Sequence, residues 1–379
     1  MSKLPSLLIL IFFLPVACLN EAGYGEEVDK SVDFDEAYFK WGYIDKKGNT
    51  VIDPQFDDSR DFQEGLAAVR IKDRWGFINQ QGEVVIPLEF KAVWPFSKRQ
   101  ARVLTEDNRM GIINPKGGWV LAPNWTEIND FSEGFSVYRD STTYGYLNES
   151  GTIAISASYQ KAWPFKNGIA KVKFEDKYGL INQQGDWVVQ PKYNRIGAVT
   201  THMIRAKIEG KYGYMDQQGA WIISPNFLAC SDFENGLAAA KTKEGYGLID
   251  SKGTWSLPPQ YDQIYALGQD KWAALKGLKY GIISSTGKIF TPFKYDQINQ
   301  YSEGIAAYRI GYFYGYLNKD GQELTDADYG LAWDAKEGLV RAAFRSGIGF
   351  MDATGTIVVR PIRGDVRDFS EGLARVQLF

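Results

Sequence analysis

The chain has 379 residues, of which 44 % are hydrophobic and 15 % aromatic, and its formal net charge is −3. This composition supplies enough apolar side chains for a substantial core, and the near balance of charge excludes a general electrostatic attraction to nucleic acid or anionic lipid. Two cysteines, Cys18 and Cys230, are too few for a disulfide framework, so the stability of the fold has to come from burial.

The first segment has the pattern of an export signal. A basic start precedes an apolar run over residues 7–16, which is shorter than the roughly 20 residues that a membrane-spanning helix needs. The sequence Pro15-Val16-Ala17-Cys18 resembles a bacterial lipobox, in which small residues precede a lipidated cysteine. We therefore expect a signal peptide at residues 1–17 and lipidation of Cys18, although Pro15 stands where an aliphatic residue is usual. The alternative is a plain cleaved signal peptide followed by an incidental cysteine.

Residues 18–40 are predicted to link the lipid to the folded domain. The stretch is rich in glutamate and aspartate and poor in core-forming residues, a composition typical of an extended, solvated linker. We expect the protein to be exported and lipid-anchored in the bacterial cell envelope, at the outer membrane or the cell surface.

The remainder, residues 41–379, is a tandem repeat. A glycine that follows an aromatic or apolar residue recurs ten times, first after 34 residues, then after 35, and then at seven further intervals of 34. A fixed period of this length is the signature of a repeat architecture. The ten glycines are Gly42, Gly76, Gly111, Gly145, Gly179, Gly213, Gly247, Gly281, Gly315 and Gly349.

Each unit is predicted to contain three short antiparallel strands. The strand around the repeat glycine (for example residues 212–216) leads into an Asp/Asn-x-x-Gly turn, which is hairpin chemistry because glycine accepts a positive φ. A β-branched strand follows (84–86) and is expected to stop at a proline. An irregular stretch with two aromatic residues then leads through Phe-x-Glu-Gly-Leu-Ala (62–67) into the third strand, and we expect no helix.

These motifs resemble those of the bacterial WG-repeat (KWG-repeat) proteins. The resemblance rests on Trp41-Gly42 and Trp75-Gly76, the turn, the proline and the Phe-x-Glu-Gly-Leu-Ala block, and it covers residues 41–379. It implies a β-rich repeat array, often exported, with no common catalytic activity. Most units depart from the pattern by carrying tyrosine, methionine or isoleucine in place of the first tryptophan.

Two architectures are open to ten such units, since a lone three-stranded unit buries too little to be stable alone. We expect an open β superhelix or solenoid, because propeller rings usually have four to eight blades of four strands. The alternative is a closed propeller-like ring, in which the last strand, residues 373–379, completes the first unit.

A row of tryptophans is the candidate binding surface. Trp119, Trp187, Trp221 and Trp255 each lie two residues after a turn glycine, and the last three are 34 residues apart. Stacked units would place them in a line that could bind sugar rings or an extended peptide. Isoleucine occupies the same position in other units, so we favour a core role for these tryptophans.

No residues form a recognisable catalytic or metal-binding set. Glu64, Glu133, Glu303 and Glu371 recur at one repeat position, so we expect them to cap backbone N–H groups beside the neighbouring glycine. His202 is the only histidine, and Cys230 belongs to no Cys-His motif, so we predict no metal site and no cofactor.

We therefore predict a non-catalytic binding or scaffold lipoprotein. Its repeat surface would engage a protein, peptide or glycan of the cell envelope, it would contact the membrane through a lipid anchor, and it would not bind nucleic acid. The alternative is a carbohydrate-active enzyme with a carboxylate pair in an aromatic cleft.

Overall fold

The computed structural model describes residues 39–268 and 270–378, and the segment Ala37–Phe379 forms one compact unit. The expected signal peptide, Cys18 and nearly all of the linker lie outside the described residues. Every regular element in the described part is a β-strand, as the repeat pattern predicted.

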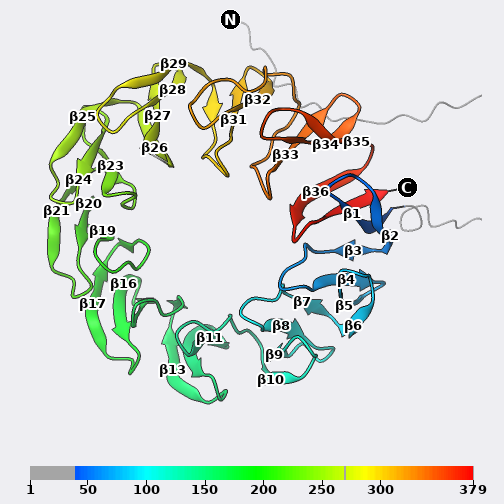
Figure 1. The fold of residues 1–379 in the computed structure, drawn as a ribbon. Coiled ribbons are helices and arrows are strands. Elements are labelled where there is room, and N and C mark those ends of the chain that lie inside the picture. The colour runs from blue at the N-terminus through cyan, green and yellow to red at the C-terminus, as the bar shows by residue number, and fades with distance from the viewer. Residues whose placement is uncertain (1–38, 269, 379) are drawn as a thin grey trace, which may run out of the picture. The chain divides into compact units, whose positions relative to one another are not determined.

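The strands form ten small antiparallel sheets, which we number as blades 1–10 in the order of their repeat glycines (Figure 1). Blade 1 contains β36 (Asp365–Ser370), β37 (Leu373–Leu378), β1 (Lys40–Asp45) and β2 (Thr50–Phe56). Blade 2 contains β3 (Asp58–Ser59), β4 (Ala67–Ile71), β5 (Arg74–Ile78) and β6 (Val84–Phe90). Blade 3 contains β7 (Ala92–Val93), β8 (Ala101–Leu104), β9 (Met110–Ile113) and β10 (Trp119–Trp125). Blade 4 contains β11 (Phe135–Asp140), β12 (Thr143–Asn148) and β13 (Ile153–Tyr159).

The next three blades have four strands each. Blade 5 contains β14 (Lys161–Ala162), β15 (Ile169–Phe174), β16 (Lys177–Asn182) and β17 (Trp187–Tyr193). Blade 6 contains β18 (Arg195–Ile196), β19 (Ile204–Ile208), β20 (Lys211–Met215) and β21 (Trp221–Phe227). Blade 7 contains β22 (Ala229–Cys230), β23 (Leu237–Lys241), β24 (Tyr246–Asp250) and β25 (Trp255–Tyr261).

The last three blades vary in strand number. Blade 8 contains β26 (Gln263–Gly268), β27 (Lys271–Lys276), β28 (Lys279–Ile283) and β29 (Ile289–Tyr295). Blade 9 contains β30 (Gln297–Ile298), β31 (Ala306–Ile310) and β32 (Phe313–Leu317). Blade 10 contains β33 (Leu339–Phe344), β34 (Gly347–Asp352) and β35 (Ile357–Ile362).

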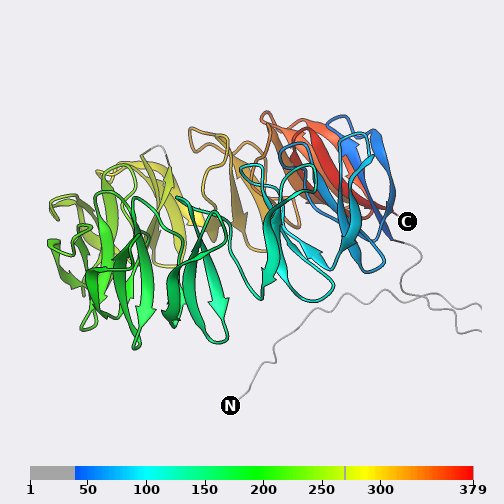
Figure 2. The same cartoon turned by 90° about the horizontal axis from the view of Figure 1, so that it is seen from below.

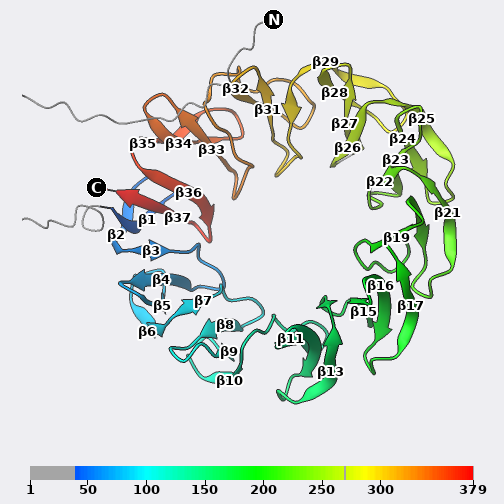
Figure 3. The same cartoon turned by 180° about the vertical axis from the view of Figure 1, so that it is seen from behind.

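The blades form a closed ring, so the expectation of an open superhelix is wrong and the alternative is correct. The C-terminal strand β37 pairs with β1 over six residues, from Lys40 opposite Leu378 to Asp45 opposite Leu373. Figure 3 shows β36 and β37 beside β1 and β2, and Figure 2 shows the blades standing side by side. The last strand thus covers an edge that the first repeat cannot pair by itself.

The prediction of three strands per unit is also wrong for most blades. Seven of the ten sheets in the described part have a fourth strand, which in five of them is a two-residue strand such as β3 or β14. These short strands come from the stretch that the sequence presented as irregular, and they lie on the inner side of the ring (Figure 1). Two residues carry too little periodicity to be recognised as a strand.

The outer strands explain why the repeat glycine is required. In blade 6, a Cβ on Gly213 would lie 2.5 Å from Ile223 O and 2.8 Å from Pro225 N. The outer strand bulges over the glycine at this point, as the register shifts between Tyr212 and Tyr214 indicate. The strand continues past the proline to Phe227, so the proline marks the bulge and does not end the strand as expected.

Adjacent blades pack through two recurring contacts. A Cβ on the turn glycine Gly253 would lie 3.1 Å from Ile223 of the preceding blade, and the same contact between Gly48 and Val359 spans the closure. Nearer the centre, Tyr43 of blade 1 packs on Phe62 of blade 2 with ring centroids 4.9 Å apart. Aromatic side chains therefore fill the spaces between blades, as the repeat pattern predicted.

Candidate functional site

The recurring glutamates cap turns in the neighbouring blade. Glu303 accepts hydrogen bonds from the backbone N–H groups of Glu337 at 3.0 Å and Gly338 at 2.7 Å. Glu371 accepts one from Gly65 N at 2.9 Å, which extends this pattern across the closure. The predicted capping role is therefore found, but the glycine belongs to the next blade and not to the glutamate's own turn.

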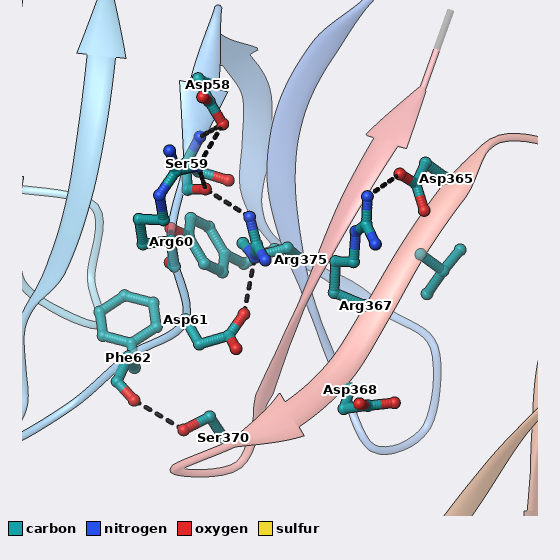
Figure 4. Close-up of polar contacts among 12 residues, drawn as sticks. Asp58, Ser59, Arg60, Asp61, Phe62, Asp365, Arg367, Asp368, Ser370 and Arg375 are labelled. Carbon is teal, nitrogen blue, oxygen red and sulfur yellow. Dashed lines mark hydrogen bonds and ion pairs between the residues drawn. The ribbon is translucent and has the colours of Figure 1, made fainter. Parts of the chain in front are cut away.

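A second set of contacts joins a cation on one blade to the inner strand of the next. Figure 4 shows Arg375 of blade 1, which bonds to Asp61 at 2.6 Å and to the carbonyl oxygen of Ser59 in blade 2. The aspartate and the carbonyl are contacted in the same way at three more interfaces. The corresponding pairs are Arg102–Asp130, Arg205–Asp232 and Arg341–Asp368, with nitrogen–oxygen distances of 2.7, 3.1 and 2.8 Å.

The candidate tryptophans lie at the start of outer strands, at the interfaces with preceding blades. Trp187, Trp221 and Trp255 are half-buried and pack edge-to-face on an aromatic residue of the blade before, as Trp221 does on Tyr193 at 5.7 Å. Trp119 is 47 % exposed. The ring of Trp187 also covers the repeat glycine Gly179, where a Cβ would lie 2.7 Å from it. These positions agree with the packing role that the repeat pattern favoured.

Among the described residues, His202 and Cys230 have the most reactive side chains, and no metal-binding group includes either of them. His202 is exposed, and its Nδ1 lies 2.6 Å from Thr201 Oγ1. Cys230 is a buried free thiol, and burial raises its pKa to about 11. Within the described ranges no group of three His, Cys, Asp or Glu side chains is placed to hold a metal ion. None of the described residues belongs to a helix able to cross a bilayer.

Among the cavities that bring acidic and aromatic side chains together, one lies between blades 3 and 4. It has a volume of about 420 Å³, and its lining includes Asp130, Glu133 and Phe131. Asp130 is paired with Arg102, and Glu133 accepts hydrogen bonds from Asn167 N and Gly168 N at 2.6 and 2.9 Å. Both carboxylates are thus engaged in contacts that join the blades.

The clearest departure from the polar surface of the other repeats lies at the hairpin tips of blades 8 and 9. The tips that join the two middle strands carry Lys72-Asp73 in blade 2 and Glu175-Asp176 in blade 5. In blades 8 and 9 they carry Gly277-Leu278 and Gly311-Tyr312. Leu278 is 89 % exposed and Tyr312 91 % exposed, and Phe313 beside Tyr312 is also exposed.

Both tips are held in place by carboxylates. Asp262 Oδ2 accepts a hydrogen bond from Gly277 N at 2.9 Å, and Asp296 Oδ2 accepts one from Gly311 N at 2.7 Å. Lys279 pairs with Asp296 at 2.6 Å, and Lys276 is exposed at the base of the first tip. The repeat pattern did not single out these residues, although comparison of the hairpin tips along the sequence would have shown two apolar tips among polar ones.

The chain belongs to the WG containing repeat family. The family profile matches ten segments, which together cover most of the chain, and each segment begins in one blade and ends in the next. The matched residues are 41–75, 75–98, 110–140, 144–178, 178–212, 212–245, 246–276, 280–312, 314–345 and 348–378. No sequence among the curated proteins matches this chain.

Several solved structures resemble the chain at low sequence identity. A computationally designed protein, Ika8, is 11 % identical and aligns over 69 % of this chain and 93 % of its own, with a TM-score of 0.35. A eukaryotic initiation factor is 9 % identical over 85 % of this chain and 94 % of its own, with a TM-score of 0.46. Hsv2p of Kluyveromyces lactis is 8 % identical over 59 % and 90 %, with a TM-score of 0.34.

Proposed function

We propose that this protein is a non-catalytic binding ring, lipid-anchored through Cys18 in the bacterial cell envelope, which docks a protein partner on the tips of blades 8 and 9. The observation that carries the proposal is the exposure of Leu278 and Tyr312 at equivalent positions of adjacent blades. Leu278 and Tyr312, with the exposed Phe313 beside Tyr312, present large apolar side chains of the kind that protein-binding surfaces carry.

The construction of the tips suits a preformed docking surface. The hydrogen bonds that Asp262 and Asp296 accept from the turn N–H groups hold both turns, so little conformational freedom is lost when a partner covers them. Tyrosine offers a large, rigid contact area and is enriched among the residues that dominate binding energy. Lys276 beside Leu278 favours a partner that presents an apolar surface bordered by carboxylates.

The row of tryptophans is a poor glycan-binding surface. Stacking on a sugar ring needs an open aromatic face, but three of the four candidate tryptophans are half-buried and packed on neighbouring aromatic rings. The other exposed apolar positions on the outer strands carry mainly valine and isoleucine, such as Val84 and Ile289.

The docking surface can be tested by site-specific crosslinking in the cells that make the protein. A photoreactive amino acid at position 312 should give a protein crosslink that disappears with Leu278→Glu. Thr142→Glu at the equivalent exposed tip of blade 4 is the matched control and should leave the crosslink unchanged. Crosslinks to lipid alone, or a protein crosslink that survives Leu278→Glu, would contradict the proposal.

Two further measurements test the remaining parts of the proposal. Cys18→Ser should move the protein from the membrane fraction to the soluble fraction, because the lipid anchor is lost. A panel of glycan substrates should show no turnover with the full chain. Turnover that is lost on changing Asp130 or Glu133 would instead favour a carbohydrate-active enzyme.

A further inference from the structure

The interface between blades 5 and 6 departs from the cation–aspartate pattern described above. Lys171 occupies the position of the arginines Arg102, Arg205, Arg341 and Arg375, because each precedes the residue that lies opposite the repeat glycine. Its Nζ donates hydrogen bonds to the carbonyl oxygens of Ile196 at 3.2 Å and Gly197 at 3.3 Å. The Ile196 carbonyl corresponds to the one that each arginine contacts.

The aspartate that completes the pattern is missing at this interface. At the other four interfaces, the second residue after that carbonyl is Asp61, Asp130, Asp232 or Asp368. At the interface of blades 5 and 6 it is Ala198. Among the described residues no carboxylate forms an ion pair with Lys171, whose charge interacts at longer range with Asp232, Arg195 and Arg205. Asp232 already pairs with Arg205 at 3.1 Å, so positive charge is in excess here.

The same change in sequence opens a cavity. Blade 6 has Gly197-Ala198-Val199 where blade 7 has Ser231-Asp232-Phe233, and these smaller side chains leave a space of about 280 Å³. Its walls include Trp163, Pro164 and Val199, with Lys171 on the same lining. The lysine ammonium lies 4.4 Å from the centre of the Trp163 ring.

Lys171 and the cavity walls define a site that lacks the carboxylate present at the four other interfaces. An ammonium group has three N–H donors, and two of those of Lys171 are used by the carbonyl oxygens. Burial lowers the pKa of Lys171 because its charge is partly removed from water, and an anion in contact would offset that cost. The apolar walls would at the same time cover a hydrocarbon or aromatic body.

We infer that the cavity between blades 5 and 6 binds an organic carboxylate with an apolar body, whose acidic group takes the place that an aspartate fills at the four other interfaces. This site is independent of the tips of blades 8 and 9, so either proposal can fail without the other. The carboxylate could belong to a free small acid or to an acidic side chain of a peptide.

The inference is tested by titrating the full-length protein with phenylacetate and hexanoate, using hexanamide as the uncharged control. A second arm uses a peptide with both ends blocked and a single glutamate between apolar residues. Binding of either carboxylate that exceeds binding of the amide at least tenfold is expected, and the arm that binds identifies the source of the acid.

Two variants locate the site. Lys171→Met should weaken binding at least tenfold, whereas Arg102→Met at the interface of blades 3 and 4 should not change it. Ala198→Asp supplies the missing carboxylate from the chain, so it should abolish binding and raise the Tm. Failure of both acids and the peptide to bind at 10 mM, or unchanged binding in Ala198→Asp, would overturn the inference.

Discussion

Arg375 Nε donates a hydrogen bond to Asp61 Oδ1 over 2.6 Å, although the two residues are 314 positions apart in the chain. Arg375 lies in the C-terminal strand of blade 1, and Asp61 follows the inner strand of blade 2 (Figure 4). The same contact joins Arg102 to Asp130 at an interface between consecutive repeats. The interface that follows the closing strand is therefore built like three other interfaces of the ring.

The first prediction concerns this contact. Arg375→Ala and Arg102→Ala should each lower the free energy of unfolding by about 1–2 kcal/mol, because each removes a charge-assisted hydrogen bond and leaves its aspartate unpaired. Urea unfolding followed by circular dichroism measures the loss. Arg367→Ala is the control, since the exposed Arg367 pairs with Asp365 of its own strand at 2.5 Å and should change stability by less than about 0.5 kcal/mol. Equal losses in all three variants would contradict the assigned role.

The second prediction separates the two reasons why glycine is needed in a repeat, which are a close contact with the outer strand and a positive φ. Gly213→Ala places a Cβ 2.5 Å from Ile223 O, so the outer strand has to move, and we expect a loss of about 2–4 kcal/mol. Gly236→Ala meets no atom within 4 Å, so its cost of about 1 kcal/mol comes from a positive φ of 81° alone. Thermal unfolding measures the difference. Similar losses in the two variants would show that the close contact is unimportant.

The third prediction concerns the candidate tryptophans. Trp221→Ala should lower the free energy of unfolding by about 2 kcal/mol, because the half-buried ring packs on Tyr193 of the preceding blade. Trp119→Ala should cost less because Trp119 is more exposed. Neither change should affect the crosslink at position 312. Loss of that crosslink in a variant that remains folded would place the binding surface on the outer strands.

The fourth prediction concerns alkaline pH. Burial raises the pKa of Tyr265 to about 12 and that of Tyr301 to about 12, against about 10 for an unfolded tyrosine. An acid whose folded pKa is raised contributes stability that is complete below the unfolded pKa and is lost as pH rises toward the folded pKa. Stability should therefore fall steeply between pH 10 and 12, with tyrosinate absorbance appearing together with unfolding.

Tyr265→Phe is the control for the alkaline transition. It removes one titrating group and the hydrogen bond from Tyr265 to the carbonyl oxygen of Ile298. The variant should be less stable at pH 7, but its stability should fall less steeply above pH 10. Tyrosine ionisation that is complete before any loss of secondary structure would contradict the assigned burial.

The amino-acid sequence by itself determined the repeat, the absence of helix in the described part and the strands around each repeat glycine, since these depend on local chemistry. Phe62 as an inter-blade aromatic and the glutamates as caps also followed from their recurrence. The two-residue inner strands could not be predicted, because pairing with β4 or β15, and not local propensity, makes them strands.

Tertiary structure alone decided that the array closes. Small rotations at each interface add up around the ten blades, and no single unit encodes their sum. The pairing of β37 with β1 closes the ring, and the packing of neighbouring blades places Lys171 on the same cavity as Ala198 of the next blade. The contacts that distinguish one interface from another join residues of different repeats, so they form only when the blades pack against one another.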